Sequence, residues 1–316
     1  MFDDATLLKI IEQYDSIVIF GHKLPDPDCY GCQVGLREII REKYPNKNVF
    51  IVGSGVVSLL PFLGNLDKIS QEVYSNSLGI LVDASGLCRS EDPNIKLCKY
   101  WIKFDHHRHN EEETFDFPHL VDEECISCAE IIYDFAVRNN LVVNKLAAQA
   151  FYCAMLADSG NFKYYGTTAH TLDVASELLK KFDNAKQLYD AVFYVDEETK
   201  RIRSYISERV KVDGQVAYAD ISKKEYDSQK VSYEKASGSV NAVGCVSSSN
   251  IFMLMTETPY GKIRVELRSN KMFPVNQVAL DFGGGGHKFA SGCEINNIPE
   301  EKRRLLDALN KVEKVV

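Results

Sequence analysis

Short apolar runs alternate with helix-like patterns along the first half of the chain. The runs are rich in branched aliphatic and aromatic residues, which predicts buried strands. Four such runs lie at 16–21, 48–53, 78–85 and 100–107. After the first run, residues 30–44 repeat apolar positions at helical spacing, and longer helical patterns fill 127–157 and 169–206. Strands that alternate with helices predict a mostly parallel sheet with helices on both faces.

The pattern changes after about residue 209. Three further β-rich segments lie at 215–222, 250–258 and 262–269. A Gly-rich segment follows them, and a last helix is predicted to begin at Pro299, because proline is favoured in the first turn of a helix. We therefore predict an α/β protein with a first domain, a linker helix and a smaller second α/β domain, at 1–189, 190–209 and 210–316.

Composition and charge narrow the class of protein. Hydrophobic residues make up 45% and charged residues 26% of the 316 positions, which is typical of a globular protein. No apolar run is long enough for a membrane span, and the acidic N-terminus does not resemble a signal peptide, so we expect a cytoplasmic protein without a membrane partner. A net charge of −8 argues against binding long nucleic acid, but not against a small phosphorylated ligand.

Potential metal ligands lie where the predicted elements end. They are His22, Asp26, Asp28, Asp83, Asp105, His106, His107 and Asp158. In open α/β sheets, the carboxyl ends of the strands gather at one edge, where ligands bind. One such aspartate alone would indicate a turn or a helix cap, but their repetition at successive strand ends indicates a site. The first segment, with Pro25 and Pro27 around Asp26, predicts a loop.

Several carboxylates that converge without a cation raise one another's pKa, and divalent metals remove that conflict. Oxygen and imidazole ligands without a thiolate favour Mn²⁺ or Mg²⁺, with Fe²⁺ or Co²⁺ as alternatives. Two such ions ~3.5–4 Å apart form the usual clamp for in-line attack at phosphorus. The sequence therefore predicts two divalent metal ions, with Mn²⁺ favoured.

These motifs resemble those of a known family. His22-x-x-x-Asp26-x-Asp28, the strand-end Asp83, Asp105-His106-His107 and Asp158-Ser159-Gly160 are similar, in the same order, to the four motifs of the DHH phosphoesterase superfamily. The segment GGGGHKFASG at 283–292, with VELRSN before it, resembles the DHHA1 substrate domain. Within the superfamily, the chain resembles the bifunctional oligoribonucleases and adenosine 3′,5′-bisphosphate phosphatases, or nanoRNases.

The resemblance implies a role for each motif residue. The metal ligands would be His22 and Asp26 for one ion, Asp28, His106 and Asp158 for the other, and Asp83 as the bridge. Asp105 would orient an imidazole without touching a metal, and His107 would face the scissile phosphate. His109 matches no motif, and we expect it on the surface.

For the second domain, the resemblance implies binding of substrate across a cleft from the metals. The expected binding residues are Arg268, Ser269, Asn270, Gly284, Gly285, Gly286 and His287. A glycine run lets backbone N–H groups approach a phosphate closely. The substrates would be short oligoribonucleotides and small phosphorylated nucleotides. The resemblance also allows a homodimer.

Two cysteine pairs depart from the pattern of the family. Cys29 and Cys32 stand where the family has small residues. They form a Cys-x-x-Cys pair, and Cys125 and Cys128 form a second pair. Because about 90 residues separate the two pairs, we predict free thiols and no zinc site.

A cyclic-dinucleotide phosphodiesterase remains an alternative function. An inorganic pyrophosphatase is less favoured, because Lys223-Lys224 is predicted on a solvated helix. A non-catalytic nucleotide-binding protein is disfavoured because every motif ligand is present.

Overall fold

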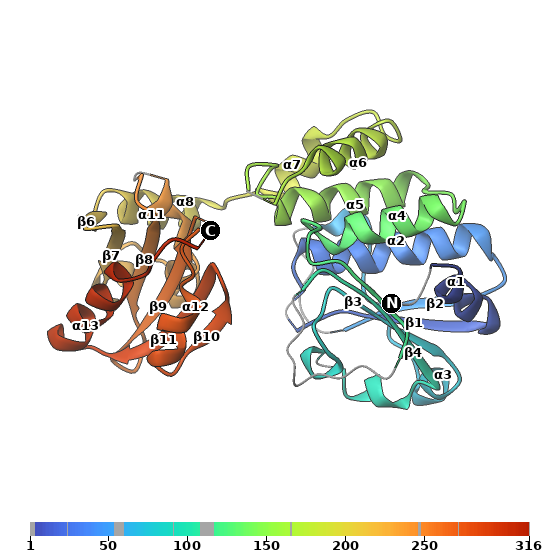
Figure 1. The fold of residues 1–316 in the computed structure, drawn as a ribbon, viewed down its shortest axis with the longest axis horizontal. Helices are drawn as coiled ribbons and strands as arrows, with labels where there is room; N and C mark the ends of the chain where they lie inside the picture. Colours follow the sequence, from blue (N-terminus) through green and yellow to red (C-terminus); the bar gives the residue numbers. More distant parts are fainter. Residues whose placement is uncertain are drawn as a thin grey trace. The chain divides into compact units, whose positions relative to one another are not determined.

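The computed structural model describes residues 4–23, 25–53, 60–90, 92–107, 117–164, 166–245, 248–270 and 272–315; for Pro61 and His287 it describes the main chain only. The chain divides into two compact units, Met1–Tyr194 and Val195–Val316 (Figure 1). No helix in these ranges is both long enough and apolar enough to cross a bilayer.

The first unit is built on a five-stranded sheet in which every strand pairing is parallel. Its strands are β1 (Ser16–Phe20), β2 (Asn48–Val52), β3 (Leu78–Val82), β4 (Tyr100–Asp105) and β5 (His119–Val121), in the spatial order β2-β1-β3-β4-β5. The first four coincide with the four predicted strands, and the predicted parallel sheet is confirmed. The short β5 was not predicted.

Helices cover both faces of this sheet (Figure 1). They are α1 (Asp4–Gln13), α2 (Pro27–Lys43), α3 (Gln71–Ser75), α4 (Cys128–Arg138) and α5 (Lys145–Asp158), while α6 (Ala169–Leu179) and α7 (Lys186–Val192) pack on α5. Because side chains alternate along a strand, Ile17 and Ile19 of β1 pack into the core that includes α2, α4 and α5, while Val18 and Phe20 pack into a second core on the other face. Both faces of β1 are therefore buried.

The long helical pattern at 127–157 forms two helices. Asn140 has a φ of 54°, the left-handed conformation that ends helices, and the N–H of Leu141 donates to the carbonyl of Ala136 at 2.8 Å. The Asn139-Asn140 pair is thus a helix stop. The turn that follows lets α5 fold back beside α2, which brings the C-terminal end of α5 to the carboxyl edge of the sheet.

The second unit contains a six-stranded mixed sheet in the order β10-β11-β9-β8-β7-β6. The strands are β6 (Lys211–Asp213), β7 (Val216–Ile221), β8 (Ile251–Glu257), β9 (Lys262–Ser269), β10 (Gly285–His287) and β11 (Ala290–Asn296). The helices are α8 (Glu197–Ser207), α9 (Lys223–Ser228), α10 (Tyr233–Ser237), α11 (Asn241–Gly244), α12 (Asn276–Asp281) and α13 (Pro299–Asn310). The alternation predicted for 262–269 is confirmed, because Ile263, Val265 and Leu267 are buried.

The strand order of the first unit determines where its site lies. The chain runs from β1 outward to β2, then returns to the other side of β1 as β3. This reversal occurs at the carboxyl ends of β1 and β3, the place where open α/β sheets bind ligands.

Candidate metal centre

The N-terminal end of α2 lies beside the end of β1. His22 follows β1 by two residues, and Asp26 caps α2 by accepting the N–H of Cys29 at 3.0 Å. The helix begins at Pro27, earlier than the loop prediction allowed, because a proline at the first helical position loses no hydrogen bond. The helical turn therefore places Asp28 and Cys29 inward, where both are fully buried.

Asp83 lies at the centre of the site. It follows β3 with a φ of 52°, a conformation that is rare for residues other than glycine, and its N–H donates to the carbonyl of Phe104 at 3.0 Å. Its carboxylate is 2% exposed and faces two histidines. Oδ2 lies 3.5 Å from Nε2 of His22, and Oδ1 lies 3.3 Å from Nε2 of His106. Asp83 thus joins two clusters, the geometry expected of a bridging carboxylate.

His106 joins the second cluster to Asp83. Its Nε2 lies 3.8 Å from Oδ2 of Asp28 and 3.4 Å from Oδ2 of Asp158, which ends α5. Its Nδ1 lies 3.3 Å from the carbonyl of Cys125, which leaves Nε2 for the carboxylates. Asp28 also accepts the N–H of Cys128 at 2.9 Å, so the start of α4 holds this carboxylate in place.

His107 has a different partner. Its Nδ1 lies 2.7 Å from Oδ1 of Asp105, which is fully buried, so this carboxylate holds the imidazole ring. This is the arrangement predicted for an orienting carboxylate. On the other side, Oδ2 of Asp105 lies 2.9 Å from Nζ of Lys103, which is 1% exposed. His109 lies outside the described residues.

The site concentrates negative charge away from water. Burial, together with the charge of Asp83, raises the pKa of Asp28 to about 7. Burial and the charge of Asp28 raise the pKa of Asp158 well above 3.8. Burial alone would lower the pKa of His106, but the facing carboxylates, led by Asp83, raise it well above 6.5. The raised pKa values of Asp28 and Asp158 reflect the carboxylates that converge in this buried cluster.

These side chains fit divalent metal ions. Three groups of ligand atoms each lie within 4.8 Å of one another: His22 with Cys29 and Asp83, Asp83 with His106 and His107, and Asp28 with His106 and Asp158. Oδ1 of Asp83 is buried and lies 3.3 Å from Nε2 of His106. A buried carboxylate is costly unless a positive charge faces it, and a metal ion held by the same ligand atoms would supply that charge. Asp26 is the most exposed predicted ligand, at 49%, and its Oδ1 already caps α2.

Two buried residues beside the site were not predicted from the sequence to belong to it. Cys29 is the sulfur member of the first group, and Lys103 is the cation behind Asp105. A signal for each was present. Cys29 replaces the small residue usual in the motif, and Lys103 interrupts an apolar strand, where a charge needs a buried partner.

The residues predicted to bind substrate lie together in the second unit. Arg268 on β9 is the register partner of Ala290 on β11, which is also the partner of His287 on β10. Part of the predicted Gly-rich loop is therefore the edge strand β10. Glycine is required directly before this strand, because a Cβ on Gly284 would lie 2.1 Å from the carbonyl oxygen of Gly292. The VELRSN and Gly-rich segments thus lie on strands β9 and β10, with β11 between them.

The remaining substrate-binding predictions have partners inside the unit. Arg268 donates to the carbonyl of Leu267 at 2.8 Å and pairs with Glu266 at 3.4 Å. The hydroxyl of Ser269 donates to the carbonyl of Phe273, and the Asn270 amide donates to the Asn250 side chain at 3.0 Å.

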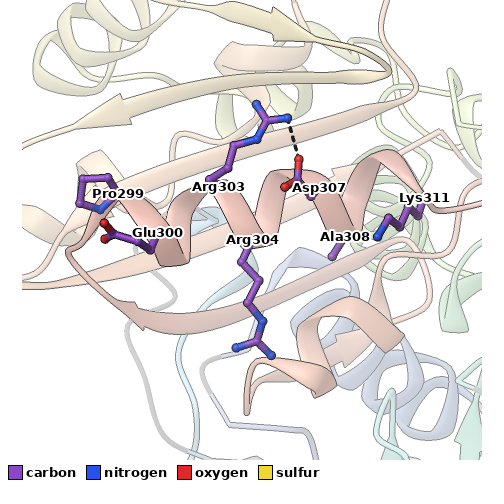
Figure 2. Close-up of a pocket in the computed structure, with 7 residues that line it drawn as sticks. All are labelled: Pro299, Glu300, Arg303, Arg304, Asp307, Ala308 and Lys311. Carbon is purple, nitrogen blue, oxygen red and sulfur yellow. Dashed lines mark ion pairs between the residues drawn. The ribbon is translucent and has the colours of Figure 1, made fainter.

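A surface hollow runs along α13 in the second unit (Figure 2). Its lining residues are Pro299, Glu300, Arg303, Arg304, Asp307, Ala308 and Lys311. Arg303 pairs with Asp307 at 2.6 Å, and the guanidinium of Arg304 lies over the ring of Phe282. None of the lining groups resembles a metal cluster, so the candidate chemistry lies in the first unit.

Family comparisons agree with this placement. The DHH family model, described as its N-terminal domain, matches residues 16–157, and the DHHA1 domain model matches residues 213–314. The fold and the metal-ligand cluster thus define a DHH-type phosphoesterase with two domains. The chain belongs to the DHH family, and its second unit carries a DHHA1 domain.

Individual relatives match over nearly the whole chain. The chain is 34% identical to the probable bifunctional oligoribonuclease and PAP phosphatase NrnA of Streptococcus mutans, over 94% of this chain and 95% of the relative. It is 32% identical to the bifunctional oligoribonuclease and PAP phosphatase NrnA of Bacillus subtilis, over 95% and 96%. A solved exopolyphosphatase-related protein from Bacteroides fragilis has the same fold, with a TM-score of 0.85, 23% identity and coverage of 98% and 95%.

Proposed function

We propose that this chain is a metal-dependent phosphoesterase that hydrolyses short RNA oligonucleotides to 5′-mononucleotides. It also removes the 3′-phosphate from adenosine 3′,5′-bisphosphate. The observation that carries the proposal is the position of Asp83, whose two carboxylate oxygens face His22 and His106 in adjacent clusters. Relatives named for both activities match the chain from end to end.

The ligand groups suit two divalent ions, for which we propose Mn²⁺. The residues that would hold them are His22, Asp26, Asp28, Asp83, His106 and Asp158. Bound there, the ions would supply Lewis-acid activation of the phosphate and of water. No sulfur from Cys32 or Cys128 is needed, because the carboxylates and imidazoles already provide hard and borderline donors.

The chain's own residues orient the reaction. The carboxylate of Asp105 holds Nδ1 of His107, so the ring presents Nε2 toward the substrate. In that position Nε2 can donate a proton to the leaving oxygen or stabilise charge on the phosphate. The proposed role of the second unit is to bind the nucleotide, through Arg268, Ser269, Asn270, the backbone of Gly284, Gly285 and Gly286, and His287.

A turnover comparison tests the function. The substrates are the ribodinucleotide pApA, adenosine 3′,5′-bisphosphate, cyclic di-AMP and pyrophosphate, each assayed with Mn²⁺. The Asp83→Ala variant is the blank, because loss of the bridging carboxylate dismantles both clusters. We expect release of AMP from the first two substrates and turnover at least about a thousandfold lower in the blank, equivalent to ~4 kcal/mol of transition-state stabilisation.

The other substrates give defined alternatives. Preference for cyclic di-AMP would assign the site to cyclic-dinucleotide turnover, and preference for pyrophosphate would refute the role given to the second unit. Activity that persists in Asp83→Ala would refute the metal centre. In addition, His287→Ala is expected to raise KM for pApA with little change in kcat.

A further inference from the structure

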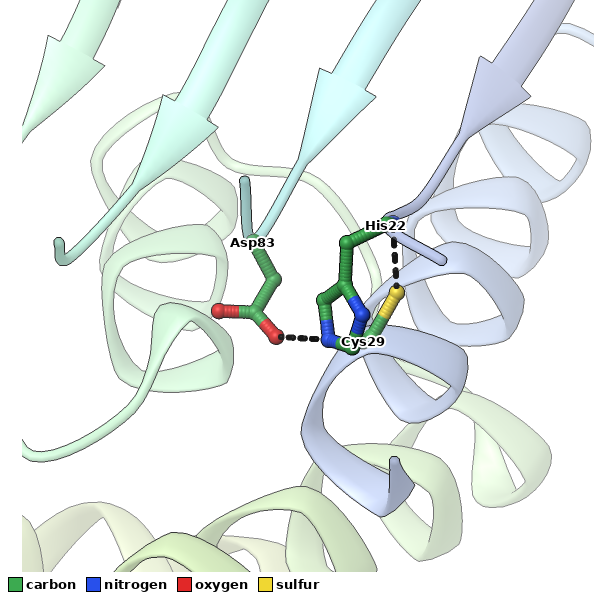
Figure 3. Close-up of side chains that lie close together, drawn as sticks. All are labelled: His22, Cys29 and Asp83. Carbon is green, nitrogen blue, oxygen red and sulfur yellow. Dashed lines mark hydrogen bonds and ion pairs between the residues drawn. The ribbon is translucent and has the colours of Figure 1, made fainter. Parts of the chain in front are cut away.

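Cys29 occupies an unusual position for a buried thiol. Its side chain is fully buried, yet its sulfur accepts the N–H of His22 at 3.3 Å and belongs to the cluster with His22 and Asp83. A buried cysteine normally packs as a small hydrophobic residue. Here the sulfur lies among an imidazole and a carboxylate. Figure 3 shows the three side chains converging from the end of β1, the end of β3 and the first turn of α2.

The neighbouring backbone makes room for this sulfur. A Cβ on Gly21 would lie 2.2 Å from Sγ of Cys29, so glycine is required directly before His22. The close approach fixes the sulfur against the end of β1. As a result, the sulfur lies close to the main chain of His22, whose N–H donates to it at 3.3 Å.

The spacing of the cluster suits a single ion. Ligand sulfur lies ~2.3 Å and ligand nitrogen ~2.0–2.1 Å from Zn²⁺, so two donors of one ion are separated by at most ~4.4 Å. The three donor atoms lie within 4.8 Å of one another, so shifts of a few tenths of an ångström close the cluster on an ion. Asp26, the alternative donor, has one carboxylate oxygen engaged as the cap of α2.

We propose that Cys29 is a sulfur ligand of the first metal ion, beside His22 and Asp83. This inference rests on the proposed metal-dependent function. As the metal–sulfur bond forms, the S–H bond breaks and its proton passes to solvent. Thiolate ligands favour Zn²⁺, Cd²⁺ and Co²⁺ over Mn²⁺ and Mg²⁺. The sulfur would therefore raise the affinity of the first site for these softer ions relative to a site built of oxygen and nitrogen alone, while Mn²⁺ stays the ion proposed for turnover.

Spectroscopy of the full-length protein loaded with Co²⁺ tests the bond directly. Thiolate ligation produces a sulfur-to-cobalt charge-transfer band in the near ultraviolet. We expect the band in the wild type and its loss in Cys29→Ser. The serine can still accept the N–H of His22, so a merely structural role of Cys29 would survive this substitution. Cys98→Ser is the matched control, because Cys98 is a buried thiol in the core on the other face of the sheet and should keep the band.

Competition binding provides a second measure. We expect Cys29→Ser to weaken Cd²⁺ binding by at least the ~10- to 100-fold that supporting residues cost, with a much smaller change for Mn²⁺. Co²⁺ binding without the band, or a band that persists in Cys29→Ser, would overturn this inference and leave the metal centre intact. A wild-type protein that binds none of these metals would overturn the proposed function as well.

Discussion

At the scale of single residues, Lys103 connects the parts of the site. Its ammonium donates to the carbonyl of Ser85 at 2.7 Å and lies 2.9 Å from the carboxylate of Asp105. Ser85 follows Asp83 by two residues, and Asp105 holds His107. Burial would raise the pKa of Asp105, but the hydrogen bond from His107 and the charge of Lys103 lower it. Lys103 is therefore a positioning residue for both the segment that follows Asp83 and the carboxylate that holds His107.

Removal of the Lys103 ammonium should lower both the stability and the activity of the protein. Lys103→Met should lower the free energy of unfolding by about 3–5 kcal/mol, because it leaves Asp105 buried without its ion-pair partner. It should also lower kcat more than it changes KM. The double variant Lys103→Met/Asp105→Asn should regain much of the stability but little activity. Urea unfolding and steady-state kinetics measure both effects, and a single variant as stable as the wild type would contradict the prediction.

The sequence could predict residue types at this scale but not their partners. The motif aspartates and histidines were visible because they recur where apolar runs end. The pairing of Lys103 with Asp105 follows from strand alternation, which puts both on one face of β4. The proximity of Cys29 to Asp83 does not follow from strand alternation, because it depends on where α2 begins relative to β3.

At the scale of elements, the junction between α4 and α6 depends on one buried carboxyl. The Glu130 oxygens accept the hydroxyl of Thr171 at 3.2 and 3.3 Å, and Thr171 forms a capping box with Thr168 at the start of α6. Burial raises the pKa of Glu130 above 4.5. The protonated form thus contributes stability that is present below pH 4.5 and is lost as the pH rises through the raised pKa.

This junction gives a prediction with an internal control. Thr171→Val should lower the free energy of unfolding by about 1–3 kcal/mol, because the carboxylate and the cap both lose a partner. The loss should grow as the pH rises, since the hydroxyl stabilises the charged form. Thr167→Val should be neutral or slightly stabilising, because the buried Thr167 hydroxyl has no hydrogen-bond partner among the described residues. Denaturation at pH 5 and pH 8 tests this, and equal effects of the two substitutions would contradict it.

Elements differ in how well the pattern predicted them. Strands β1 to β4 were predicted because each is a run of apolar residues bounded by polar ones. The three-residue strands β5, β6 and β10 are too short for any periodicity, and neighbouring strands determine them. The glycine run that includes β10 looked like a flexible turn, but close backbone contact with β11 makes it a strand.

At the scale of the whole molecule, each unit has its own core. The helix α8, within the segment predicted as a linker, belongs to the second unit. Its Ile202 and Ile206 are fully buried in a cluster with Ala217 and Ile221 of β7. A fragment designed to fold as the second unit therefore has to include α8. A fragment that lacks α8 loses Ile202 and Ile206 from this cluster and exposes to water the apolar groups that they cover.

Two fragments test this division. Residues 195–316 should unfold cooperatively on their own, because their cores draw only on that range. Residues 210–316 should be less stable by several kcal/mol, since loss of a single buried isoleucine side chain typically costs ~2–5 kcal/mol. Circular dichroism during urea unfolding compares them. Equal urea midpoints for the two fragments would show that α8 does not stabilise the second unit.

The ligands of the metal centre are spread widely along the chain. His22 follows the first strand, while Asp158 ends the fifth helix. A growing chain thus contains most of the ligands long before it can bring them together. Only after α5 has left the ribosome and folded against α2 does the centre close. A chain that ends before α5 consequently lacks Asp158, and with it one of the carboxylates proposed to hold the metal ions.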